Sequence, residues 1–251
     1  HLSGTGCCDY GDVLLMPTVG EVQLQPGDEN DPQSGYRSAF QHKNEKASAG
    51  YYSVKLDDHN IKAELTATAR TGFHRYTFPA SEKSNIILDL KSRDFVINST
   101  LKIISDTEVS GLRRSKRWAE DQYVYFYAKF SKPFHTCGIA LNDTLRSETK
   151  SAEGQNIRAF FSFDTKENER ILVKIGISAV DEEGARKNLE AENPDWNFDK
   201  VAKKAKDDWN TFLSKIEVEG GTEKQRRIFY TALYHTAIAP NIFQDVDNRY
   251  R

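Results

Sequence analysis

Short runs of apolar, β-branched and aromatic residues, separated by turn residues, dominate the chain up to about residue 178. In residues 63–70, small or apolar side chains alternate with polar ones, which is the period of a strand with one buried face. So many short runs without helical periodicity predict a large antiparallel β-sandwich. The predicted strands span residues 13–16, 22–24, 53–56, 61–69, 73–78, 86–90, 95–104, 109–112, 123–130, 135–141, 157–163 and 171–177.

One predicted strand, residues 123–130, carries apolar or aromatic side chains on both of its faces. A strand that is covered on one side only would alternate apolar with polar residues. The pattern therefore places this strand in the middle of a sheet and between layers.

The period of the pattern changes at Asp181, where Asp181, Glu182 and Glu183 form a helix start. Thr222 and Gln225 have the spacing of a capping box, and the helix that follows is expected to end before Pro240. Two or three amphipathic helices are therefore predicted. One apolar helical stripe is formed by Phe198, Val201, Ala205, Trp209, Phe212 and Ile216.

These stripes need more covering surface than the sheets offer, so we expect a helical domain beyond Arg251. The predicted domains are a β-sandwich over residues 1–180, incomplete at its amino terminus, a helical linker over 181–221, and the first helix and loop of a further domain over 222–251. The sequence begins at His1 rather than Met and ends without a cap or tail, and we therefore interpret it as part of a longer protein.

Composition and charge exclude several classes of function. The 251 residues contain 35 Lys and Arg against 37 Asp and Glu, a net charge of -2, which leaves no basic surface for nucleic acid. The basic run at residues 113–118 is then best interpreted as a solvated hairpin end. No apolar run approaches the ~18 residues of a membrane helix, so we expect no membrane span.

The residues that could carry chemistry form few recognisable motifs. Three cysteines, two of them adjacent at Cys7 and Cys8, make neither a disulfide framework nor a zinc site. Asp245 and Asp247 match the first two ligand positions of an EF-hand calcium loop, but Arg249 occupies the next position, where a calcium ligand is needed. Two hypotheses stay open for the pair: the carboxylates bind sugar hydroxyls or orient a metal ligand, or they are ordinary solvated turn residues. Trp118 is either a platform for a sugar ring or a packing residue.

Several segments, taken in order, resemble glycoside hydrolase family 92, the calcium-dependent exo-acting α-mannosidases of glycan-degrading bacteria. The resemblance covers nearly the whole chain. It is carried most specifically by HLSGTGCCDYGDVLLMP at residues 1–17 and PNIFQDVDNRYR at 240–251, and also by ATARTGFHRYTFP at 67–79, SGLRRSKRWAEDQYVYFYA at 110–128 and FYTALYHT at 229–236. The family usually has glycine where Cys8 and Asn248 stand.

The resemblance implies an amino-terminal β-sandwich, a helical linker and an (α/α)6 barrel, in which this chain lacks most of the barrel. It implies hydrolysis of terminal α-mannose with inversion, by one carboxylic acid and one carboxylate on opposite sides of the sugar ring. It also implies a calcium ion that binds sugar hydroxyls, and a periplasmic, cell-surface or secreted bacterial protein. The family's acid, base and most calcium ligands lie in the barrel, so no catalytic or metal residue is assigned here, and this chain alone is expected to be inactive.

The resulting interpretation is the sandwich and linker of an α-mannosidase whose partners are α-mannoside glycans and its own carboxy-terminal barrel. The alternative is a non-catalytic carbohydrate-binding sandwich, which would not need the helices after Asp181. The candidate substrate-binding residues are Gly6, Cys7, Asp9, Trp118, Asp245, Asp247 and Tyr250.

Overall fold

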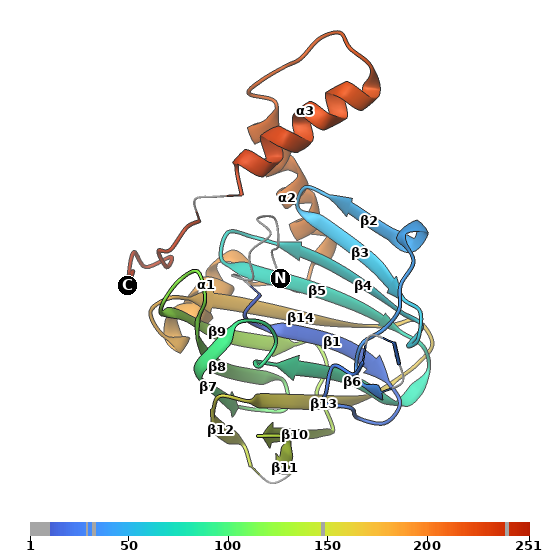
Figure 1. Ribbon diagram of the computed structural model, residues 1–251, viewed down its shortest axis with the longest axis vertical. Helices are drawn as coiled ribbons and strands as arrows, with labels where there is room; N and C mark the ends of the chain where they lie inside the picture. The colour runs from blue at the N-terminus through green and yellow to red at the C-terminus, as the bar shows by residue number, and fades with distance from the viewer. Residues whose placement is uncertain (1–10, 29, 32–33, 147–148, 239–240) are drawn as a thin grey trace.

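The computed structural model describes residues 11–28, 30–31, 34–146, 149–238 and 241–251. Two antiparallel sheets, stacked face to face, make up most of the described chain, and three helices follow them (Figure 1). The mainly β fold and the β-sandwich predicted from the hydrophobic pattern are thereby confirmed.

The larger sheet has nine strands in the order β12-β7-β8-β9-β14-β5-β4-β3-β2, and a short 3-10 helix, His42–Asn44, precedes β2. Its strands are β2 (Glu45–Ser48), β3 (Tyr51–Leu56), β4 (Ile61–Ala67), β5 (Thr71–Phe78), β7 (Phe95–Ile103), β8 (Glu108–Lys116), β9 (Gln122–Phe130), β12 (Ser151–Gly154) and β14 (Glu169–Ser178). The smaller sheet has five strands in the order β1-β6-β13-β10-β11. These are β1 (Leu14–Val19), β6 (Ser81–Asp89), β10 (Thr136–Leu141), β11 (Thr144–Arg146) and β13 (Ile157–Thr165).

The strands that the sequence pattern missed are β2, β11 and β12, and all three lie at sheet edges. Their residues are mostly exposed and polar, so they carry no buried face from which alternation could be recognised. The pattern also predicted one strand that does not form, at residues 22–24. Val22 and Leu24 instead pack as a loop against Tyr36, Ile87 and Phe160.

The core lies between the two sheets and is dominated by aromatic rings. Phe130 of β9 packs against Phe161 and Phe163 of β13, with ring centroids 5.0 and 6.1 Å apart. Phe134 closes the cluster at 4.9 Å from Phe161. Rings at these separations, in tilted and edge contacts, bury large apolar areas. This burial stabilises the packing of the two sheets against each other.

Strand β9 lies between β8 and β14, in the middle of the larger sheet, as its two-sided apolar pattern predicted. Its inner face joins the core through Phe126 and Phe130. On its outer face Tyr127 packs against Ala185 and Leu189 of helix α1 (Glu182–Glu192). Helix α1 therefore covers the sheet beside the end of β14.

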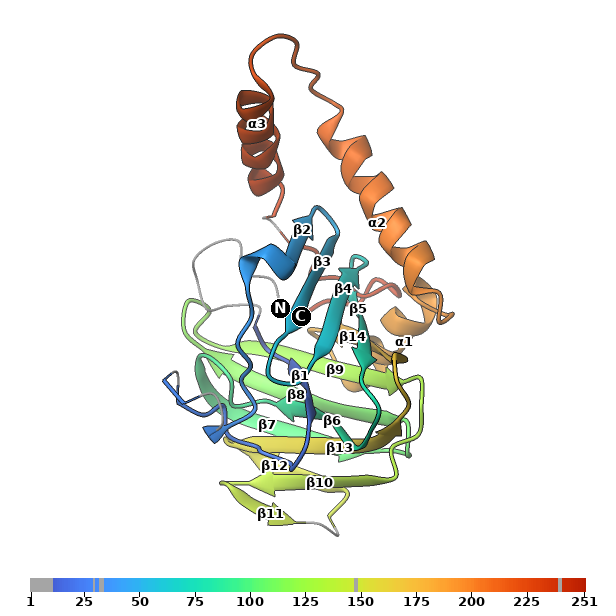
Figure 2. The same cartoon turned by 90° about the vertical axis from the view of Figure 1, so that its right-hand side faces the viewer.

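The remaining helices are α2 (Phe198–Leu213) and α3 (Glu223–Thr236), which extend away from the sandwich as an antiparallel pair (Figures 1 and 2). The predicted capping box is present, because Thr222 and Gln225 each bond the other's backbone N–H. Ile216, assigned to the stripe of α2 from the sequence, lies beyond its end. After α3 the chain returns to the sandwich and reaches α1 (Figure 1). Among the described residues no helix combines the length and apolarity needed to cross a membrane.

Candidate functional site

The turn end of the β8–β9 hairpin brings together the two ends of the described chain. Asp12, close to the first described residue, accepts hydrogen bonds from Arg113 of β8 at 2.8 Å and Gln122 of β9 at 3.3 Å. Arg251, the last residue, lies over the ring of Tyr123 of β9, with its Cζ 3.4 Å from the ring centroid. Because neighbouring strand residues face opposite sides, Asp12 and Arg251 approach opposite faces of one hairpin.

Arg113 is fully buried on the inner face of this hairpin end. Besides Asp12, its guanidinium donates to Ser115 Oγ at 3.0 Å and to the carbonyl oxygens of Leu90, Ser92 and Arg93 at 2.9, 3.0 and 2.6 Å. A buried guanidinium needs this number of acceptors to offset its lost hydration. Arg113 therefore fixes the segment that enters β1, and the interpretation of residues 113–118 as a solvated end is wrong for this residue.

The outer face of the hairpin end carries stacked aromatic and guanidinium groups. Arg114 lies over Tyr123 at 4.8 Å and is held there by a two-pronged ion pair with Asp121, at 2.6 and 2.8 Å. Tyr125 stacks beside Tyr123 with centroids 6.4 Å apart and an interplanar angle of 23°. Flat apolar faces next to hydrogen-bond donors suit the binding of a sugar ring.

The returning segment, residues 244–250, is called the carboxy-terminal loop, and Asp245 anchors it. Asp245 is 3 % exposed, and its carboxylate accepts hydrogen bonds from Ser178 Oγ at 2.8 Å and Asn188 Nδ2 at 2.7 Å. The side-chain oxygen Oδ1 of Asn188 also accepts a hydrogen bond from the backbone N–H of Val246 at 2.8 Å. A Cβ at Gly184 would lie 2.2 Å from Asp245 Oδ2, so only glycine leaves room for this contact. The loop is therefore fixed on β14 and α1.

A second set of contacts holds the tip of the same loop. Arg249 donates to both oxygens of Asp181, at 2.6 and 3.1 Å, and to Asp247 at 3.0 Å. The hydrogen bond from Lys187, followed by those from Arg249, keeps the pKa of Asp247 below its usual value, and Arg249 does the same for Asp181. Both carboxyl groups are ionised at neutral pH, which makes neither of them suitable as the proton donor of a glycosidase.

The structure places the sequence candidates in different surroundings. Trp118 and Tyr250 are 74 % and 75 % exposed, on the β8–β9 turn and at the end of the carboxy-terminal loop. Asp245 is neither open to a ligand nor a solvated turn residue, because protein donors occupy its carboxylate. Asp247 is partly exposed and paired with Lys187. Gly6, Cys7 and Asp9 lie outside the described residues.

Sequence reasoning missed Asp12, Arg113, Tyr123 and Arg251 as members of this assembly. Strand alternation gave a usable signal for Arg113, because Val109, Gly111 and Arg113 fall on one face of β8 and Val109 is buried in the core. For calcium, the described part of the chain offers no group of three or more His, Cys, Asp or Glu that could hold a metal ion.

Comparisons with known proteins match the chain in two consecutive parts. The model of the glycosyl hydrolase family 92 N-terminal domain matches residues 1–178, and that of the family's catalytic domain matches residues 184–251. An uncharacterized secreted glycosidase of Arthroderma benhamiae is 26 % identical over 269 residues, which covers 96 % of this chain and 34 % of its own length.

Solved structures of the same family share the fold. A family GH92 alpha-mannosidase from Bacteroides thetaiotaomicron, also solved in complex with mannoimidazole, is 37 % identical, with a TM-score of 0.94 over 100 % of this chain and 35 % of that one. A family GH92 inverting mannosidase from the same organism is 26 % identical, with a TM-score of 0.83 over 95 % of this chain and 31 % of that one. The chain thus spans about a third of the length of the relatives it matches.

Proposed function

The chain belongs to glycosyl hydrolase family 92, and from that premise we propose that the whole protein is an exo-acting α-mannosidase that removes terminal α-mannose from glycans. The observation that carries this proposal is the 37 % identity to an alpha-mannosidase across 100 % of the chain, with both family domains matched in order. The mannoimidazole complex of that relative supports a mannose-sized ring as the ligand.

The proposed reaction is hydrolysis with inversion, supported by the inverting mannosidase among the structural relatives. Such a reaction needs a protonated carboxyl and an ionised one roughly 6.5 to 9.5 Å apart. In the carboxy-terminal loop the carboxylate of Asp247 is paired with Lys187 and Arg249, and that of Asp245 is occupied by Ser178 and Asn188. We therefore assign the acid and the base to the part of the enzyme outside this chain, together with the ligands of the proposed calcium ion.

The contribution proposed for this chain is to bind and orient the glycan. Tyr250 and Trp118 are the exposed aromatic candidates, and Arg113 and Asp245 hold the two segments that lead to the hairpin end. Ring faces of Tyr and Trp contact the apolar face of a pyranose, and the neighbouring guanidinium groups donate to its hydroxyls. Gly6, Cys7, Asp9 and Asp247 remain proposed glycan contacts.

The proposal is tested on the complete protein with 4-nitrophenyl α-mannoside and with α-linked mannobiose. Release of mannose, β-mannose as the first anomer in proton NMR, and loss of activity in EDTA with recovery in calcium are expected. Binding of mannosides without release of mannose would instead favour the carbohydrate-binding sandwich. α-Mannose as the first anomer would contradict inversion. The 251-residue chain alone is expected to release no mannose.

Export from the cell is the last part of the proposal, and the secreted glycosidase of Arthroderma benhamiae supports it. For a bacterial source we propose the periplasm or the cell surface. Activity found only in the cytoplasmic fraction of the native organism would contradict it.

A further inference from the structure

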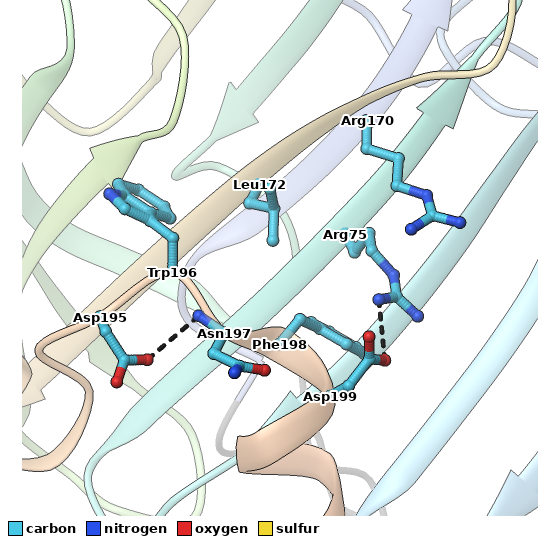
Figure 3. Close-up of a pocket in the computed structure, with 8 residues that line it drawn as sticks. All are labelled: Arg75, Arg170, Leu172, Asp195, Trp196, Asn197, Phe198 and Asp199. Carbon is cyan, nitrogen blue, oxygen red and sulfur yellow. Dashed lines mark hydrogen bonds and ion pairs between the residues drawn. The ribbon is translucent and has the colours of Figure 1, made fainter.

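A groove of about 550 Å³ lies on the outer face of the larger sheet, between the strands and the α1–α2 connection (Figure 3). Its floor consists of Arg170 and Leu172 of β14 and Arg75 of β5, and Asp195, Trp196 and Asp199 form its wall. Along β14, Ser178 pairs with Tyr125 and Val173 with Phe130. Arg170 and Leu172 therefore lie at the end of the sheet remote from the β8–β9 turn.

Trp196 is held as a rigid platform at this groove. The buried ammonium of Lys174 lies 4.3 Å from the centre of its ring and donates to the carbonyl oxygens of Asn193, Pro194 and Asp195 at 2.8, 3.2 and 3.3 Å. Phe73 supports the ring at 6.2 Å. Lys174 belongs to β14 and packs against the indole, while 39 % of Trp196 stays exposed. A fixed aromatic face costs little entropy when a ligand stacks on it.

Polar groups with spare hydrogen-bonding capacity lie at the other end of the groove from Trp196, beyond Leu172 (Figure 3). The side chain of Arg170 makes no hydrogen bond or ion pair with any described residue, and it lies on the floor of the groove with that of Leu172 (Figure 3). One carboxylate oxygen of Asp199 accepts a hydrogen bond from the guanidinium of Arg75 at 2.9 Å, and the side chain of Asp199 is 77 % exposed. The groove thus presents unused guanidinium donors on one side and carboxylate acceptors on the other.

The charges of the groove favour a neutral ligand. Arg75 is paired with Glu64 as well as Asp199, and it is stacked on Phe198 at 4.2 Å. The two arginines of the lining are matched by Asp195 and Asp199, so neither a polyanion nor a polycation is attracted. A pyranose ring has an apolar face for the indole and hydroxyls that both donate and accept hydrogen bonds.

We propose that this groove binds hexopyranose units of a neutral glycan. Trp196 stacks on one ring, and at the other end of the groove Arg170 donates to hydroxyls of the glycan and Asp199 accepts from them. Bound there, a branched or polymeric glycan stays on the enzyme while its ends are trimmed, which raises the effective concentration of those ends. The choice of mannan as a probe rests on the proposed function, whereas the groove itself does not.

The test measures the affinity of the complete protein for yeast mannan by affinity electrophoresis. Trp196→Ala is expected to weaken mannan binding about 10-fold or more and Arg170→Ala several-fold. Phe40→Ala, which removes an aromatic side chain that is 48 % exposed elsewhere, is the matched control and is expected to stay within about twofold of the parent. Because the side chain of Arg170 is exposed and pairs with no residue that the structure describes, its variant decides the question if Trp196→Ala fails to fold.

Two outcomes would overturn the proposal. One is mannan binding by Trp196→Ala and Arg170→Ala equal to that of the parent. The other is a loss of mannan affinity in Phe40→Ala as large as that in Trp196→Ala, because the loss would then not be specific to the groove. If the protein releases no mannose but binds mannan or another hexose polymer through Trp196, the groove is supported and the proposed function fails.

Discussion

The sandwich and the α2–α3 pair use the same kinds of side chain in opposite surroundings. Phe161 in the sandwich is fully buried, whereas Phe229 in α3 is 36 % exposed and none of the described α3 residues is buried. Helix α2 buries only Phe198 and Ala205. Its carboxy-terminal half contacts α3 through the rings of Trp209 and Tyr234, whose centroids are 4.6 Å apart. Local signals such as the capping box define these helices, but they do not anchor them to the core.

The largest expected difference is in amide hydrogen exchange of the 251-residue chain. Strand β9 is hydrogen-bonded on both sides and buried, so its amides exchange only through near-global unfolding, whereas α3 opens locally. We expect exchange in α3 to be faster than in β9 by at least about 10³-fold, with α2 from Phe198 onward in between. Equal protection of α3 and β9 would show that the helices form one cooperative unit with the sandwich.

Truncation of matched phenylalanines sharpens the same contrast. Phe161→Ala leaves a cavity among Phe130, Phe134 and neighbouring rings and is expected to lower the free energy of unfolding by about 3–5 kcal/mol. Phe229→Ala in α3 should lower it by less than about 1 kcal/mol. Denaturant titration of both variants measures the two values, and similar losses would contradict the contrast.

Glu64 lies where the two regions meet, and it predicts a dependence on pH. Burial alone would raise the pKa of Glu64, but the hydrogen bonds from Arg75, Tyr51 and Lys62 outweigh it and lower that pKa to about 2. A lowered folded-state pKa stabilises the protein above the unfolded-state value, and this contribution is lost as the pH falls toward 2. Glu64→Gln should therefore cost about 2 kcal/mol at pH 7 and much less near pH 2.

The control for Glu64 is Glu223→Gln, which breaks an exposed pair with Arg227 at 2.9 Å in α3. Exposed pairs of this spacing contribute less than about 0.5 kcal/mol. A stability difference between Glu64→Gln and the parent that stays constant from pH 7 to pH 2 would contradict the assigned role of the Glu64 carboxylate.

The smallest expected effect on the sandwich comes from Thr222→Ala, which removes the capping box of α3. An N-cap contributes about 1 kcal/mol to its own helix. Because α3 is not buried in the core, the midpoint of sandwich unfolding should stay within experimental error while helical circular dichroism falls. A shift of that midpoint by several degrees would show that α3 stabilises the sandwich.

Sequence patterns predicted the strands that have a buried face and failed at the edges. Residues 123–130 have apolar or aromatic side chains on both faces, and this pattern predicted a central strand. In contrast, β11 and β12 consist largely of exposed residues. The candidate site was harder to predict from the sequence, because the hydrogen-bond partners of Asp245 lie 67 and 57 residues away along the chain, at Ser178 and Asn188. Whether such a carboxylate faces solvent or a buried donor depends on how β14 and α1 pack, which no local pattern specifies.

The burial of Asp245 also has a consequence for the order of assembly. Its donors stand on β14 and α1, so the carboxy-terminal loop docks only after the last strand of the sandwich has paired and α1 has folded against it. Arg251 is therefore expected to reach Tyr123 only after the sandwich has closed, although Tyr123 is synthesised long before it. A mutation that slows closure of the sandwich is therefore expected to delay docking of the carboxy-terminal loop and of Arg251 as well.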